Sequence, residues 1–158
     1  MLNGFELLDF KIINKNNLTV LEITIMKPGG FVSFNDCSLI SKEVSQELDK
    51  EDYSDYFTHK YFLEVQSPGV SRVLKNSREY QLFRNYYVKV LTNVKYNDLG
   101  LEFIGKLYDV GENFLELTDI ELLPSPKNKK IKLECNSIKI ELPHLQEVKL
   151  YDQKIPVL

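Results

Sequence analysis

Histidine, cysteine and carboxylate side chains are scattered along this sequence without the spacing that catalysis or metal binding needs. His59 and His144 have no neighbouring cysteine or acidic residue at metal-ligand spacing. No glycine-rich phosphate loop of the GxGxxG or GxxxxGK[ST] type occurs. No two carboxylates are set apart as an acid and base pair. The sequence therefore predicts no catalytic residues, no metal site and no cofactor, and a protein that is not an enzyme.

The individual reactive residues have simple structural interpretations. Cys37 falls in the apolar stripe of a predicted helix and is interpreted as a buried small hydrophobic residue rather than a nucleophile. Cys37 and Cys135 form no CxxC pair, and we expect both to be reduced thiols. His59 at a loop end and His144 in a tight turn are expected to face solvent or to make local hydrogen bonds.

Composition is that of an ordinary globular protein, with 158 residues, 43% hydrophobic and 27% charged. No apolar run approaches the ~20 residues that span a bilayer, and the first residues lack signal-peptide character. We therefore expect a cytoplasmic protein.

Charge divides the chain in two. Residues 1–66 carry six Lys and eleven Asp or Glu, whereas residues 67–158 carry fourteen Lys or Arg and twelve acids. An acidic group lies in the second half of the predicted helix and just after it, and it includes Glu43, Glu47 and Asp49. Basic groups come later, at Arg72, Lys75, Arg78, Arg84 and Lys89, and again at Lys127, Lys129 and Lys130. Each group is either solvated surface charge without a partner or a binding surface. As a binding surface, the acidic group would suit a basic protein and the basic groups would suit phosphate.

Apolar periodicity in the first half predicts a small α+β domain. Segments 5–13 and 18–26 alternate with period two and predict a hairpin, in which Leu8, Phe10 and Ile12 share the apolar face. Ser33 and Asp36 stand at capping-box spacing before a helix that ends near 48–49, with an apolar stripe of Cys37, Ile40, Val44 and Leu48. Segment 61–66 predicts a third strand. The prediction is a three-stranded sheet with one helix on one face.

One helix of ~10 Å diameter is too narrow to cover three strands at ~4.8 Å spacing. We therefore expect one of two outcomes. Either the aromatic loop at 53–57 folds over the gap, or an apolar patch remains near Phe5 to Ile12.

The second half predicts an all-β domain after a connector. Ser77 is predicted to cap a short helix at 78–84, and Asn85 to end it in the left-handed conformation. Strands are expected near 86–94, 101–110, 113–120, 129–135, 137–142 and 147–151, with a bulge at Gly105 and a helical turn at 143–146. This pattern favours an SH3-like or Sm-like barrel. The expected organisation is an N-terminal domain at 1–70, a linker and short helix at 71–85, and a C-terminal barrel at 86–158.

Two stretches are more distinctive than the rest. One is PGGFVSFNDC at 28–37, and the other is YFLEVQSPGVSRVL at 61–74, which contains the junction residues Glu64, Ser67, Pro68, Gly69 and Arg72. In this order and separation they resemble the ribosome maturation factor family RimP. FIGKL at 103–107 and EVKL at 147–150 are similar to the family's barrel strands. Departures include Gln66 for a serine and Val73 for a proline, and the chain begins at a strand where the family usually begins with a helix.

The resemblance implies a non-catalytic factor that binds the free small (30S) ribosomal subunit and promotes its late assembly. The implied partners are rRNA and an early-joining basic ribosomal protein of the decoding region, with no membrane partner, and we expect a monomer. We assign the acidic face to the protein and the basic groups to rRNA phosphates. For Arg72 two roles stay open, a phosphate contact or an ion pair that pins the two domains together.

Two other functions compete with this interpretation. One is a general Sm-like or KH-like RNA-binding module not dedicated to ribosome assembly, in which Tyr86, Tyr87 and Tyr96 stack on bases. Core packing of these tyrosines is the simpler alternative, and a monomer on a sizing column favours the assembly factor over a ring of barrels. The other is an enzyme, which substrate-dependent turnover would reveal.

Overall fold

The computed structural model describes residues 3–16, 18–50, 60–123 and 137–151. The chain forms two compact units, Met1–Pro68 and Gly69–Leu158. The predicted strand at 129–135, the aromatic loop at 53–57, Cys135, His59 and the lysines at 127, 129 and 130 lie outside the described residues.

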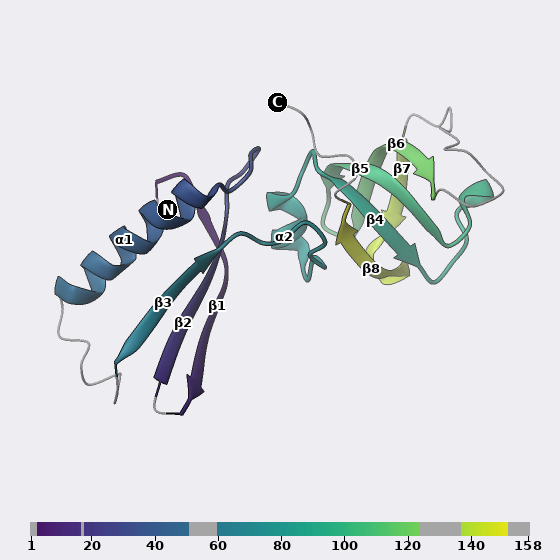
Figure 1. Cartoon of the computed structure of the whole chain (residues 1–158). Helices are drawn as coiled ribbons and strands as arrows, with labels where there is room; N and C mark the ends of the chain where they lie inside the picture. Colours follow the sequence, from purple (N-terminus) through teal and green to yellow (C-terminus); the bar gives the residue numbers. More distant parts are fainter. Residues whose placement is uncertain (1–2, 17, 51–59, 124–136, 152–158) are drawn as a thin grey trace. The chain divides into compact units, whose positions relative to one another are not determined.

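The first unit is a three-stranded sheet with one helix on one face (Figure 1), as predicted. Strand β1, Glu6–Lys15, pairs antiparallel with β2, Leu18–Met26, and β2 pairs in parallel with β3, Tyr61–Gln66. A parallel neighbour requires a crossover connection, which helix α1, Phe34–Lys50, supplies. The sheet order is therefore β1-β2-β3, with β2 in the centre.

The predicted capping box begins α1. The Ser33 backbone N–H and Oγ both lie 2.8 Å from Asp36 Oδ2, and the Asp36 N–H donates back to Ser33 Oγ at 3.2 Å. Because the carboxylate accepts these bonds, the pKa of Asp36 lies below its ordinary value, chiefly through the backbone N–H of Ser33. Of the predicted stripe, Ile40 is fully buried, whereas Cys37 is only half-buried. Partial burial raises the pKa of the Cys37 thiol.

The core of this unit joins α1 to β2 and β3. Phe5, Ile23, Ile25 and Ile40 are buried together, and Val44, Leu63 and Val65 pack against them. The same sheet face continues onto β1, because Phe10 lies opposite Ile23 and Ile12 opposite Leu21.

An apolar patch is exposed on β1, which was one of the two expected outcomes. Leu7, Phe10 and Ile12 are 45%, 52% and 53% exposed. A bulge between Leu7 and Asp9 removes Leu8, which is half-buried, from the paired register and places Leu7 opposite Ile25, an irregularity that the alternating pattern did not predict. Within the described part of the first unit, α1 packs against β2 and β3, and the side chains of Leu7, Phe10 and Ile12 on β1 remain exposed.

The second unit is a five-stranded antiparallel sheet of order β7-β6-β5-β4-β8 (Figure 1). Its strands are β4 Tyr87–Thr92, β5 Glu102–Val110, β6 Phe114–Leu122, β7 Ser137–Glu141 and β8 Leu145–Leu150, with short helical turns η2 Asn97–Leu99 and η3 Leu142–His144. The bulge expected at Gly105 is confirmed by the register shift between Ile104 and Lys106. The whole chain is therefore α+β, and closure of the second sheet into an SH3-like barrel stays a prediction.

Candidate partner-binding surfaces

The connector after the junction motif is fixed to the second unit by backbone hydrogen bonds. The Leu74 N–H donates to Val148 O at 2.8 Å, and the Leu150 N–H donates to Arg72 O at 2.9 Å. Val73 thereby forms a bridge with Lys149 next to β8. Leu74 is 3% exposed, so its burial adds to these bonds. Residues 72–74 of the predicted linker are therefore hydrogen-bonded to β8 and form part of the second unit.

Helix α2, Ser77–Leu82, follows the connector and is capped differently from the prediction. Asn76 is the cap, and its side-chain oxygen accepts from the Glu79 N–H at 3.0 Å. The predicted cap at Ser77 is wrong by one residue, and the helix ends before Arg84. Asn85 has the predicted left-handed conformation, with a φ of 72°, but it does not end the helix, because α2 stops at Leu82 with Phe83 as its C-cap.

Arg72 lies in a buried ion pair with Glu79, which the sequence did not indicate. Arg72 donates from Nε to Glu79 Oε2 at 3.1 Å and from Nη2 to Oε1 at 2.8 Å. The Lys75 N–H donates to the same carboxylate at 3.2 Å. The two side chains are 9% and 4% exposed. This bidentate geometry holds the connector against α2. Both residues belong to the second unit, so the pair is a structural contact within that unit and not the predicted one between the two domains.

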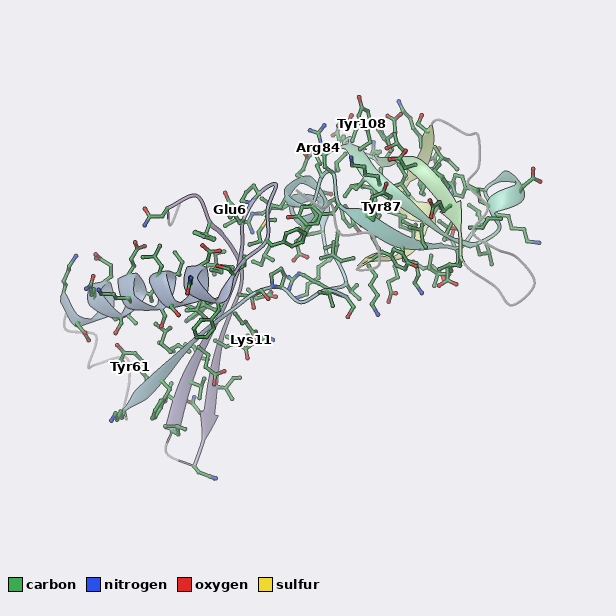
Figure 2. All side chains as sticks on the ribbon, turned by 45° about the horizontal axis from the view of Figure 1, so that its top comes forward. Glu6, Lys11, Tyr61, Arg84, Tyr87 and Tyr108 are labelled. Atoms are coloured by element: carbon green, nitrogen blue, oxygen red, sulfur yellow. The ribbon has the colours of Figure 1, made fainter. Side chains whose placement is uncertain are left out.

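Two more residues of the predicted basic surface have acidic partners. Arg84 donates from Nε to the Tyr108 carbonyl at 3.0 Å and approaches Asp109 at 3.5 Å; Figure 2 shows Arg84 and Tyr108 close together. Lys89 lies 2.6 Å from Glu102, and this hydrogen bond raises the pKa of Lys89. These acids lower the positive charge that Arg84 and Lys89 present to a partner.

Lys75 and Arg78 are the members of the basic group that are exposed on the connector and α2. In the sequence, both residues lie between Arg72 and Glu79, the two partners of the buried ion pair. The exposed cations are therefore carried on backbone that a buried ion pair and two backbone hydrogen bonds hold in place.

The predicted acidic face is on α1. Glu43 is half-buried and accepts from Asn3 Nδ2, whereas Glu47 pairs with Lys50 at 2.5 Å across one helical turn. Asp49 is exposed in the last turn. The carboxylates at 47 and 49 face solvent, and exposed pairs such as Glu47–Lys50 add little stability.

The three tyrosines proposed for base stacking contact protein side chains instead. Tyr86 packs edge-on against Phe83 with ring centroids 5.4 Å apart. Tyr87 donates to Asp119 at 3.2 Å, and burial is the main cause that raises the pKa of Tyr87. Tyr96 lies 2.8 Å from His144 Nδ1 and packs against Phe103. All three are half-buried, so they pack against protein side chains without belonging to the fully buried core.

Metal chemistry and membrane insertion find no support in the described part of the chain. Within residues 3–16, 18–50, 60–123 and 137–151, no group of three or more His, Cys, Asp or Glu side chains is placed to hold a metal ion. No helix among these residues is long and apolar enough to cross a membrane.

The fold and the surfaces thus define a two-unit α+β protein with exposed carboxylates at the end of α1, beside Lys50, and exposed cations around α2. Residues 2–71 match the family model described as the RimP N-terminal domain. The match supports the assignment of the first unit to the RimP family, whose members are ribosome maturation factors that assist assembly without catalysing a reaction. The matched range includes the first unit from residue 2 onward and most of the junction motif.

Proposed function

We propose that this protein binds the free small ribosomal subunit in the cytoplasm and promotes its late assembly as a monomer. The observation that carries the proposal is the match of residues 2–71 to the RimP N-terminal domain. The junction residues Glu64, Ser67, Pro68 and Gly69 fall inside the match.

We assign the rRNA contact to the surface around α2. Lys75 and Arg78 are exposed, and the Arg72–Glu79 pair fixes the backbone that carries them. Lys127, Lys129 and Lys130 are further candidates, outside the described residues. Positive charge placed on ordered backbone positions a protein on phosphates at a smaller entropic cost than flexible cations do.

We assign a contact with a basic ribosomal protein of the decoding region to the acidic end of α1. Glu47 and Asp49 are exposed there, and Glu43 lies one turn before Glu47 on the same helix. Complementary charge would speed association and fix its orientation more than it would add affinity.

A general RNA-binding module is the less favoured alternative. Such a module needs a continuous basic groove and aromatic side chains available to bases. Here Arg84 and Lys89 lie beside Asp109 and Glu102, which reduce their positive charge, and Tyr96 contacts His144 and Phe103.

Co-sedimentation with purified ribosomal particles tests the proposal. We expect the protein to pellet with free small subunits, but not with large subunits, joined ribosomes or an equal mass of unstructured RNA. Binding to all of these RNAs alike would instead indicate the general module.

The salt dependence of the same binding tests the assigned surface. Replacing both Lys75 and Arg78 by Ala should weaken binding and reduce the slope of log K against log salt by about one per lost phosphate contact. Lys95→Ala is the matched control, because Lys95 is an exposed lysine away from α2. An unchanged slope in the double variant would remove these residues from the interface.

A further inference from the structure

A groove in the second unit lies between the connector and α2 on one side and η3 and β8 on the other. Its volume is about 540 Å³, within the range of roughly 300–1,000 Å³ that is usual for small-ligand sites. Leu142, Leu145 and Val148 supply apolar lining from η3 and β8, and Leu74 adds to it from the connector. The groove therefore offers an apolar surface of the size that a small ligand needs.

Uncharged polar side chains line the same groove. Ser77 and Tyr80 come from one face of α2, and Gln146 comes from β8. Among the described residues, none makes a hydrogen bond to these three side chains. Tyr80 is half-buried, and burial raises the pKa of its hydroxyl, which stays a neutral donor and acceptor at neutral pH. The groove thus combines apolar lining with an aromatic ring and hydrogen-bonding groups that are available to a ligand.

The charges differ between the interior of the groove and its α2 side. Lys75 and Glu147 are the charged side chains that line it, so the lining carries no net charge. Arg78 is exposed and follows Ser77 on α2, which adds a second cation on the side of Lys75. An uncharged ligand therefore fits the interior, and phosphates attached to that ligand fit the α2 side.

The backbone at the groove leaves no place for an added peptide strand. The Leu74 N–H donates to Val148 O at 2.8 Å on one side of β8, and Val148 pairs with Val90 of β4 on the other side. An extended peptide therefore finds no unpaired strand edge at Val148. A nucleobase needs no such edge, because it is flat and uncharged and is held by stacking and by hydrogen bonds to its own edge.

We propose that this groove holds one unpaired base of RNA. The base stacks on Tyr80 and presents its hydrogen-bonding edge to Gln146, and the flanking phosphates lie at Lys75 and Arg78. Proteins read RNA chiefly at unpaired bases, through stacking and contacts to the base edges. The proposal deepens the rRNA contact proposed for α2 and rests on that proposed function only for the source of the RNA.

Amide chemical shifts of the full-length protein test the proposal. The probe is triuridylate, a trinucleotide whose bases are unpaired. Its matched control is the same trinucleotide without bases, which keeps the ribose–phosphate backbone and its charge. We expect saturable shifts at Ser77, Tyr80 and Gln146 with triuridylate, and much smaller shifts with the abasic control, because it has nothing to stack on Tyr80.

Two variants and one control assign the contact to the groove. Tyr80→Ala should weaken triuridylate binding about five- to a hundredfold, which is the effect of losing one base stack. Gln146→Ala changes an exposed side chain, so this variant should fold, and it should weaken binding about two- to tenfold through the lost hydrogen bond. Tyr108→Ala should leave affinity unaltered, because Tyr108 is an exposed tyrosine of the same unit that does not line the groove.

Three results would overturn the proposal. These are no shifts with triuridylate, equal shifts with the abasic control, or equal affinity in the Gln146→Ala, Tyr80→Ala and Tyr108→Ala proteins. A blocked peptide of alternating Lys and Val that shifts the groove amides where triuridylate does not would assign the groove to a protein partner instead. Because the probe is a trinucleotide and not a ribosomal particle, failure here would leave the co-sedimentation result standing.

Discussion

Breaking the Arg72–Glu79 pair should destabilise the second unit more than any other single loss of charge among the described ion pairs. The two side chains are 9% and 4% exposed and share two hydrogen bonds of 2.8 and 3.1 Å. Arg72→Ala would leave the Glu79 carboxylate buried without its guanidinium partner, although the Lys75 N–H would still donate to it. Removing one partner of a buried pair costs about 3–5 kcal/mol, because the other charge stays desolvated.

A double variant separates the cost of losing the whole ion pair from the cost of leaving one charge buried without its partner. In Arg72→Met/Glu79→Leu no charge stays buried, so we expect a smaller loss of stability than in Arg72→Ala. Glu79→Gln keeps the shape of the side chain but removes the countercharge of Arg72, and it should also cost about 3 kcal/mol. Arg84→Ala is the control, because the Arg84–Asp109 side chains are 46% and 44% exposed. It should cost at most about 1 kcal/mol.

Urea unfolding followed residue by residue measures these costs. Val88 and Ile140, both 0% exposed, report on the second unit, and Ile25 reports on the first. The loss should appear in the Val88 and Ile140 transitions. A cost below about 1 kcal/mol for Arg72→Ala, or a double variant whose cost equals the two single costs added, would refute the reasoning.

Three further changes test the fold by measured stability. Ile25→Ala should cost about 2–5 kcal/mol in urea unfolding, whereas Phe10→Ala on the bare half of the sheet should cost under about 1 kcal/mol, and equal costs would show that β1 is covered. Gly105→Ala should cost about 1–3 kcal/mol, because its Cβ would meet Leu117 Cβ at 3.0 Å; an unchanged midpoint would contradict this contact. Asp36→Asn should lose stability above the unfolded pKa of ~4 and lose none well below it, since the native pKa is lowered; a pH-independent difference would contradict the capping role.

Local signals in the sequence were sufficient for most elements of the first unit. Ser33 and Asp36 predicted the start of α1 because a capping box is complete within four residues. The bulge at Leu8 could not be predicted, since it is a property of the pairing with β2 and not of the β1 sequence. The width argument nevertheless predicted that α1 alone would not cover the sheet, because it needed only the count of strands and helices. It left open whether the loop at 53–57 would fill the gap or an apolar patch would remain.

The basic surface was harder to predict than the fold. Arg72, Arg84 and Lys89 look like a cationic group in the sequence, yet each meets an acid that the fold brings close. Glu79 was missed as a partner, although its place three residues after Asn76 is a capping signal. Spacing along a chain indicates which charges are present, and tertiary structure decides which of them stay available to a partner.

Sucrose-gradient analysis of cells that lack the gene is the most direct test of the account. A ribosome maturation factor of the small subunit predicts an excess of free small subunits that contain unprocessed rRNA, restored by the intact gene. A gradient with the normal ratio of subunits and fully processed rRNA would contradict it.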